Sequence, residues 1–96
     1  MNTEKIRKDS ASLLFTIADK WKKEKGSIPP RTMLQKVAVE LIESSEGKLS
    51  GIPILRFHYG QILAVRYEES QISEYPLFVL SQPQMSNVVS LINKYH

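Results

Sequence analysis

The N-terminal part of the chain repeats its hydrophobic residues three or four positions apart, with lysine, arginine and aspartate between them. The apolar positions are Ile6, Leu13, Leu14, Ile17, Ala18 and Trp21. This spacing follows the 3.6-residue period of a helix and predicts a long amphipathic helix with one buried face. Gly26 is expected to end the helix, because glycine adopts the left-handed conformation after a helix at little cost.

A second helix is expected after Pro29 and Pro30, which make the connection between the two helices stiff. Thr32 is its predicted N-cap, and Gln35 follows three residues later, which is the spacing of a capping box. Its buried face is predicted to carry Leu34, Val37, Ala38, Leu41 and Ile42. Two helices joined by a short, stiff linker are expected to pack antiparallel or to cross steeply.

The hydrophobic period then changes from that of a helix to that of a strand. Two β-branched and aromatic runs, Ile52–Tyr59 and Ile62–Tyr67, flank Gly60 and predict a hairpin. A three-residue loop at Tyr59–Gln61 is the preferred register, because a two-residue loop would mix the apolar and polar faces. In that register one face carries Leu55, Phe57, Leu63, Val65 and Tyr67, and the other carries Arg56, His58, Ala64 and Arg66.

A third strand and a final helix complete the predicted elements. Pro76–Leu80 is apolar at both alternating positions, so this strand is expected to be covered on both faces. The polar segment before it, Glu68–Tyr75, is predicted to be a loop. The last helix, about Gln82–Tyr95, should begin with a capping box at Ser81 and Gln84. Its apolar stripe consists of Met85, Val88, Val89 and Ile92.

These elements occur in the order ααβββα and predict one compact α+β domain over residues 1–96. The two N-terminal helices are expected to pack on one face of a three-stranded antiparallel sheet, and the C-terminal helix to close an end or the far face. The chain has 96 residues, of which 42% are hydrophobic and 24% charged. This composition is typical of a single globular domain that builds its own core.

Composition narrows the possible chemistry. The chain has no cysteine, so disulfides, thiolate metal ligands and cysteine nucleophiles are excluded. The charged N-terminal segment does not resemble a secretory signal, and no apolar run approaches the length of a membrane span. A cytoplasmic protein is therefore expected.

Candidate catalytic groups are sparse and scattered. The two histidines are His58, beside the predicted turn, and His96, at the last position. Asp9 and Asp19 both fall on the polar side of the first predicted helix, and no glycine-rich phosphate loop follows a predicted strand. Catalysis and metal binding need several such groups to converge. We therefore predict that the protein is not an enzyme and assign no catalytic, cofactor or metal-binding residue.

The charge is unevenly distributed. Residues 1–36 contain nine Lys or Arg and four Asp or Glu, a balance of +5, whereas the remainder contains four and six, a balance of −2. This asymmetry is compatible with nucleic-acid binding. The residues for that alternative are Lys20, Lys22, Lys23, Arg56 and Arg66, with Lys25 close by. The competing interpretation is a solvated helix end whose lysines complement the helix dipole.

Nucleic-acid binding could use a winged-helix-like arrangement or the open face of the predicted sheet. In the winged-helix version the second helix would enter the major groove. Its outward residues would be Gln35, Lys36, Val39, Glu40 and Glu43. Carboxylates that face phosphates oppose the main electrostatic attraction, which weakens this version.

The favoured function is non-catalytic binding of a protein, as an interaction module or a regulatory or inhibitory adaptor. Self-association as a homodimer is expected, because the predicted third strand offers apolar side chains on both faces. The candidate partner-binding residues are Trp21, Arg56, Tyr59, Arg66 and Tyr75, which are of the types that anchor interfaces. For Trp21 the alternative is a place in the core, because it belongs to the apolar stripe of the first predicted helix.

Overall fold

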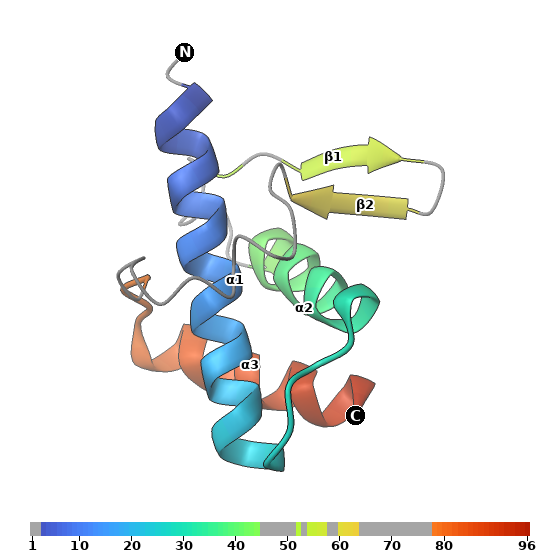
Figure 1. Cartoon of the computed structure of the whole chain (residues 1–96). Coiled ribbons are helices and arrows are strands. Elements are labelled where there is room, and N and C mark those ends of the chain that lie inside the picture. The colour runs from blue at the N-terminus through green and yellow to red at the C-terminus, as the bar shows by residue number, and fades with distance from the viewer. Residues whose placement is uncertain (1–2, 45–51, 53, 58–59, 64–77) are drawn as a thin grey trace.

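The computed structural model of the chain describes residues 3–44, 52, 54–57, 60–63 and 78–96 (Figure 1). Three helices and two short strands lie in this part of the chain. They are α1 (Thr3–Lys25), α2 (Arg31–Ser44), β1 (Ile54–Phe57), β2 (Gly60–Leu63) and α3 (Gln82–Tyr95).

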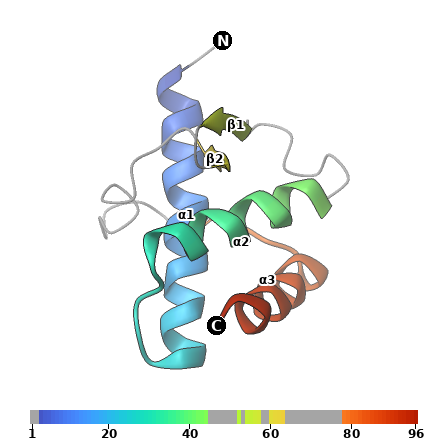
Figure 2. The same cartoon turned by 90° about the vertical axis from the view of Figure 1, so that its right-hand side faces the viewer.

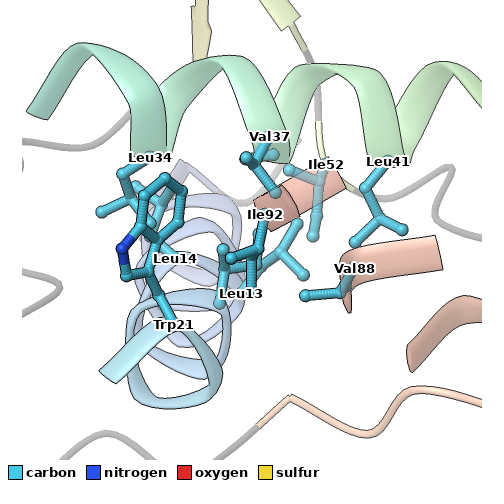
Figure 3. Packing of buried hydrophobic residues seen from close by; sticks show 11 residues of the cluster. Leu13, Leu14, Trp21, Leu34, Val37, Leu41, Ile52, Val88 and Ile92 are labelled. Carbon is cyan, nitrogen blue, oxygen red and sulfur yellow. The ribbon is translucent and has the colours of Figure 1, made fainter. Parts of the chain in front are cut away.

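The three helices pack on one another around one apolar core. α2 crosses α1 steeply, which is one of the two arrangements expected for a stiff linker, and α3 packs against both (Figures 1 and 2). The core contains Leu13, Leu14, Ile17, Trp21, Leu34, Val37, Ala38, Leu41, Ile52, Val88 and Ile92. The close-up in Figure 3 shows these side chains meeting between the helices. The helical stripes predicted from the sequence therefore supply most of the buried surface.

The predicted α+β fold with a three-stranded sheet is wrong. In the described residues the helices cover one another instead of a sheet, and the architecture is helical. The strands there form a single antiparallel pair beside α2 (Figure 1). The apolar stripes are satisfied by contacts between helices, so no sheet face is needed to cover them.

The segment predicted as a third strand also differs from expectation. Residues 78–80 precede α3 without belonging to a strand, and the rest of Pro76–Leu80 lies outside the described residues. Phe78 and Leu80 are half-buried against the core, whereas Val79 is 91% exposed. The backbone N–H of Phe78 donates to the Thr16 hydroxyl of α1 at 2.7 Å. This segment is therefore held by a helix side chain and is covered on one side only.

The hairpin has a different register from the one predicted. Ile54 pairs with Leu63 and Phe57 pairs with Gly60. Two residues therefore separate the strands, and the three-residue loop at Tyr59–Gln61 is wrong. A two-residue connection matches the natural twist of paired strands, which explains why Gly60 belongs to the ladder.

The ends of α1 and α3 follow the predicted chemistry. Gly26 has a φ of 76° and donates its N–H to the Lys22 carbonyl at 2.7 Å, which closes α1. At the start of α3, the Ser81 hydroxyl accepts from the Gln84 N–H at 3.2 Å. The Gln84 side chain accepts from the Ser81 N–H at 2.9 Å and completes the capping box.

The predicted cap of α2 is wrong. The helix begins at Arg31, and the Leu34 N–H donates to the Pro30 carbonyl at 3.0 Å, so Thr32 already lies inside the first turn. Gln35, the expected partner of Thr32, is 9% exposed. Because Thr32 lies inside the helix, it is not the N-cap from which the predicted capping box would start.

Candidate functional site

A hollow of about 230 Å³ opens between α2 and α3, and we call it the α2–α3 hollow. It is lined by Lys36, Val39, Glu40, Glu43 and Tyr95. The four α2 residues occupy positions i, i+3, i+4 and i+7 and therefore share one helix face. Tyr95 comes from the last turn of α3, so the hollow exists only because α3 packs across α2.

Glu40 is the central charged group of the hollow. Its Oε1 accepts a short hydrogen bond from the Tyr95 hydroxyl, and both carboxylate oxygens accept from Lys94 Nζ, at 3.0 and 3.3 Å. The Tyr95 hydrogen bond, followed by Lys94, lowers the pKa of Glu40 against the opposing effect of burial. The same contacts raise the pKa of Tyr95 and of Lys94, in each case mainly through the hydrogen bond to Glu40. At neutral pH this group is therefore an ionised carboxylate held by two protonated donors.

The aromatic ring of Tyr95 also lies within reach of two ammonium groups. Lys94 Nζ is 5.2 Å and Lys36 Nζ is 5.9 Å from the ring centroid. These distances fall within the range of a cation–π contact. Tyr95 is thus oriented both through its hydroxyl and through its ring, with Val39, only 6% exposed, as an apolar neighbour.

Glu43 differs from Glu40 in its surroundings. It is exposed at the edge of the hollow, and among the described residues its carboxylate has no ion-pair or hydrogen-bond partner. Among the described residues, the hollow therefore offers an outside molecule one carboxylate without a partner, one lysine beside an aromatic ring, and the small exposed part of Val39. Within the described part of the chain no three His, Cys, Asp or Glu side chains come together to hold a metal ion.

A second polar contact lies at the other end of the α2–α3 interface. Asn87 Nδ2 donates to the Ser44 hydroxyl at 2.7 Å, and that hydroxyl donates to the Leu41 carbonyl at 3.1 Å. Together with the Glu40 contacts, this hydrogen bond fixes how α3 lies along α2. The shape of the hollow follows from that alignment.

Of the partner-binding residues predicted from the sequence, the structure describes the side chain of Trp21 alone. Trp21 is 2% exposed and packs in the core near Leu34 (Figure 3), with its ring centroid 6.1 Å from that of His96. Its burial removes it from the predicted contact surface and agrees with the alternative of a core position. Arg56 lies on β1 opposite Gln61. Its side chain, and the other candidates Tyr59, Arg66 and Tyr75, lie outside what the structure describes.

The lysines of the nucleic-acid alternative are not equivalent. Lys20 pairs with Glu24 at 3.1 Å. Lys23 pairs with Asp19 at 3.0 Å. Lys22 is exposed and has no partner among the described residues. Two of the three α1 lysines named for the nucleic-acid alternative are therefore paired with acids of their own helix.

The sequence placed several residues of the hollow on the outward side of the second helix but did not identify a site there. Lys36 and Glu43 are exposed as expected, whereas Gln35 and Val39 are buried. The missing information was the position of Tyr95, which is 55 residues from Glu40 in the chain. A contact between residues so far apart in the chain cannot be predicted from a local sequence pattern.

Comparisons of the chain with protein-family models, curated proteins and solved structures found no match. Among the described residues, no helix combines the length and the apolar character required to cross a membrane. Arguments about function therefore depend on the residues and their geometry.

Proposed function

We propose that the chain is a small non-catalytic module that binds a protein through the α2–α3 hollow. The observation that carries this proposal is the composition of the hollow, where an oriented tyrosine and Val39 lie beside a lysine and a carboxylate that has no partner among the described residues. An aromatic anchor with polar groups around it is the usual make-up of a protein contact site.

The state of Glu40 favours binding over proton transfer. A general base or acid works best with a pKa near neutral pH. The Tyr95 hydroxyl and Lys94 shift the pKa of Glu40 away from that range and occupy its oxygens. The role of Glu40 is then to hold Tyr95 in place, which reduces the side-chain conformational entropy that is lost when a partner binds.

A photo-crosslinking experiment tests this proposal. A benzophenone amino acid is placed at Glu43, at the edge of the hollow, and in a control at Lys5, which is exposed on the first turns of α1. We expect the Glu43 probe to give protein adducts of defined mass in an extract of the source cells, and excess unlabelled chain to suppress them. Equal adducts from both positions, or adducts removed by nuclease, would contradict the proposal.

Self-association is a separate part of the proposal. The sequence favoured self-association because the predicted third strand was expected to be covered on both faces. Val79 is exposed, so residues 78–80 do not support that expectation. Light scattering over a wide dilution series tests it directly. A homodimer has twice the chain mass of 11.0 kDa. A mass of 11.0 kDa at every concentration would show that the chain is a monomer.

A further inference from the structure

Several lysines near one end of the molecule form no ion pair among the described residues, although the charge of one of them, Lys36, helps to lower the pKa of Glu40. Among the described side chains, four acids are paired with lysines: Asp9 with Lys5, Asp19 with Lys23, Glu24 with Lys20 and Glu40 with Lys94. Lys22, Lys25 and Lys36 form no ion pair within that part of the chain. We call these three residues the unpaired lysines.

The unpaired lysines belong to elements that meet. Lys22 and Lys25 lie in the last turn of α1, next to Trp21, whose ring contacts His96 after α3. Lys36 lies over the ring of Tyr95, the residue before His96. Both views show the end of α1 and the C-terminal end of α3 at the same end of the molecule (Figures 1 and 2). Lys36 therefore lines the hollow itself, and Lys22 and Lys25 lie on the neighbouring end of α1, at the same end of the molecule as the end of α3.

We infer that the partner is an acidic protein segment, an inference that rests on the proposed function of the hollow. Carboxylates of this segment would pair with Lys22, Lys25 and Lys36, and an apolar side chain would contact Val39 and Tyr95. Complementary charges of this kind speed association and select between partners.

The same residues favour a protein over a nucleic acid. Tight binding to nucleic acid depends on neutralising many phosphates. Lys20 and Lys23 already neutralise acids of α1. Glu43 also places an unpaired carboxylate at the hollow, which repels phosphates, whereas a protein can meet it with a basic residue. The mixture of charges and apolar surface is therefore better matched by a polypeptide.

A binding titration with an acidic peptide tests the inference. The probe is a fluorescently labelled peptide of glutamates interrupted by leucine, followed by anisotropy at low ionic strength. The variant K22Q/K25Q/K36Q removes the unpaired lysines, and the control K5Q/K20Q/K23Q removes the same number of charges from paired lysines. We expect about a 10-fold loss of affinity in the first variant and about a 2-fold loss in the control. Equal losses in the two would show attraction by net charge alone and would overturn the inference.

Two further measurements sharpen this test. Glu43→Gln removes the carboxylate that repels the peptide and should strengthen its binding about 2-fold; weaker binding would contradict the proposed location. An oligothymidylate of equal charge should bind less tightly than the peptide, and tighter binding would overturn the choice of a protein partner. Crosslinking at Glu43 without any binding of the acidic peptide would remove this inference and leave the proposed function standing.

Discussion

α3 is held in two different ways on its two sides. Toward the core it presents Val88 and Ile92, which are 1% and 0% exposed. Along α2 it is held by polar contacts at the surface, from Asn87 to Ser44 and from Lys94 and Tyr95 to Glu40. The first side excludes water completely, whereas the second remains partly solvated.

The two sides of α3 contribute to different properties, the core side to stability and the α2 side to the proposed function. Burial of hydrocarbon is the main source of folding free energy, and it has no directional preference. Hydrogen bonds and ion pairs near the surface contribute little net stability, but they require particular positions of their atoms. The core side therefore keeps α3 folded against the molecule, and the α2 side sets the alignment that creates the hollow.

The largest effect is expected from the core side. Ile92→Ala removes a fully buried side chain and should lower the free energy of unfolding by about 2–5 kcal/mol. Urea unfolding followed by circular dichroism measures it. Asn93→Ala, at the exposed next position, is the control and should change little. Similar losses from both variants would show that α3 does not pack on the core as described.

The link between α1 and the segment before α3 should have the next largest effect. The buried Thr16 hydroxyl donates to the Ser12 carbonyl and accepts from the Phe78 N–H, each at 2.7 Å. Thr16→Val leaves that N–H without its acceptor and should cost about 1–3 kcal/mol of unfolding free energy. Thr16→Ser keeps the hydroxyl and should recover most of the loss. A valine variant as stable as the wild type would contradict this contact.

The helix starts provide a smaller and more selective test. Ser81→Ala removes the N-cap of α3 and should cost about 1 kcal/mol of unfolding free energy. Thr32→Ala changes a residue inside the first turn of α2 and should cost far less. Thermal unfolding of the two variants under one set of conditions compares them. A larger loss at Thr32 would restore the sequence-predicted cap of α2.

The smallest effect is expected on the polar side of α3, where it should depend on pH. Glu40 has a lowered pKa, so its stabilising contact is present above the ordinary value of 4.5 and is lost as the pH falls through the lower value in the folded state. Tyr95→Phe should therefore cost under about 1 kcal/mol of unfolding free energy at pH 7 and almost nothing in acid. In a Glu40→Gln variant, Tyr95→Phe should cost the same free energy of unfolding at every pH, because residue 40 then has no carboxylate to titrate. A cost of Tyr95→Phe that persists in acid would assign the loss to packing.

Residues that act locally were predictable from the sequence. The apolar stripes of the three helices, the glycine stop after α1 and the capping box of α3 all depend on neighbours within a few positions. The same local chemistry failed at Thr32, because α2 begins one residue earlier, at Arg31, directly after the two prolines. The three-stranded sheet failed for a different reason. Residues 78–80 are all apolar, so the sequence indicated neither which side is buried nor whether a strand or a helix lies against it.

The candidate site was predictable only in part. Lys36, Glu40 and Glu43 were placed on one outward face of the second helix by their spacing alone. Tyr95 was assigned to the last helix, but nothing local indicates that its hydroxyl meets Glu40. The ion pairs of Lys20 and Lys23 follow from the i, i+4 spacing of opposite charges. That spacing was the available signal that Lys20 and Lys23 are paired within their own helix, whereas Lys22 and Lys25 are not.

The most direct test of the account is a map of the surface that an acidic peptide contacts. The backbone amides of an isotopically labelled chain are followed by NMR while the glutamate–leucine peptide is added. The account predicts shifts concentrated at the last turn of α1, at Lys36–Glu43 of α2 and at the end of α3, with Lys5 and Lys8 unchanged. Shifts spread over every lysine-bearing surface, or confined to β1 and β2, would contradict it.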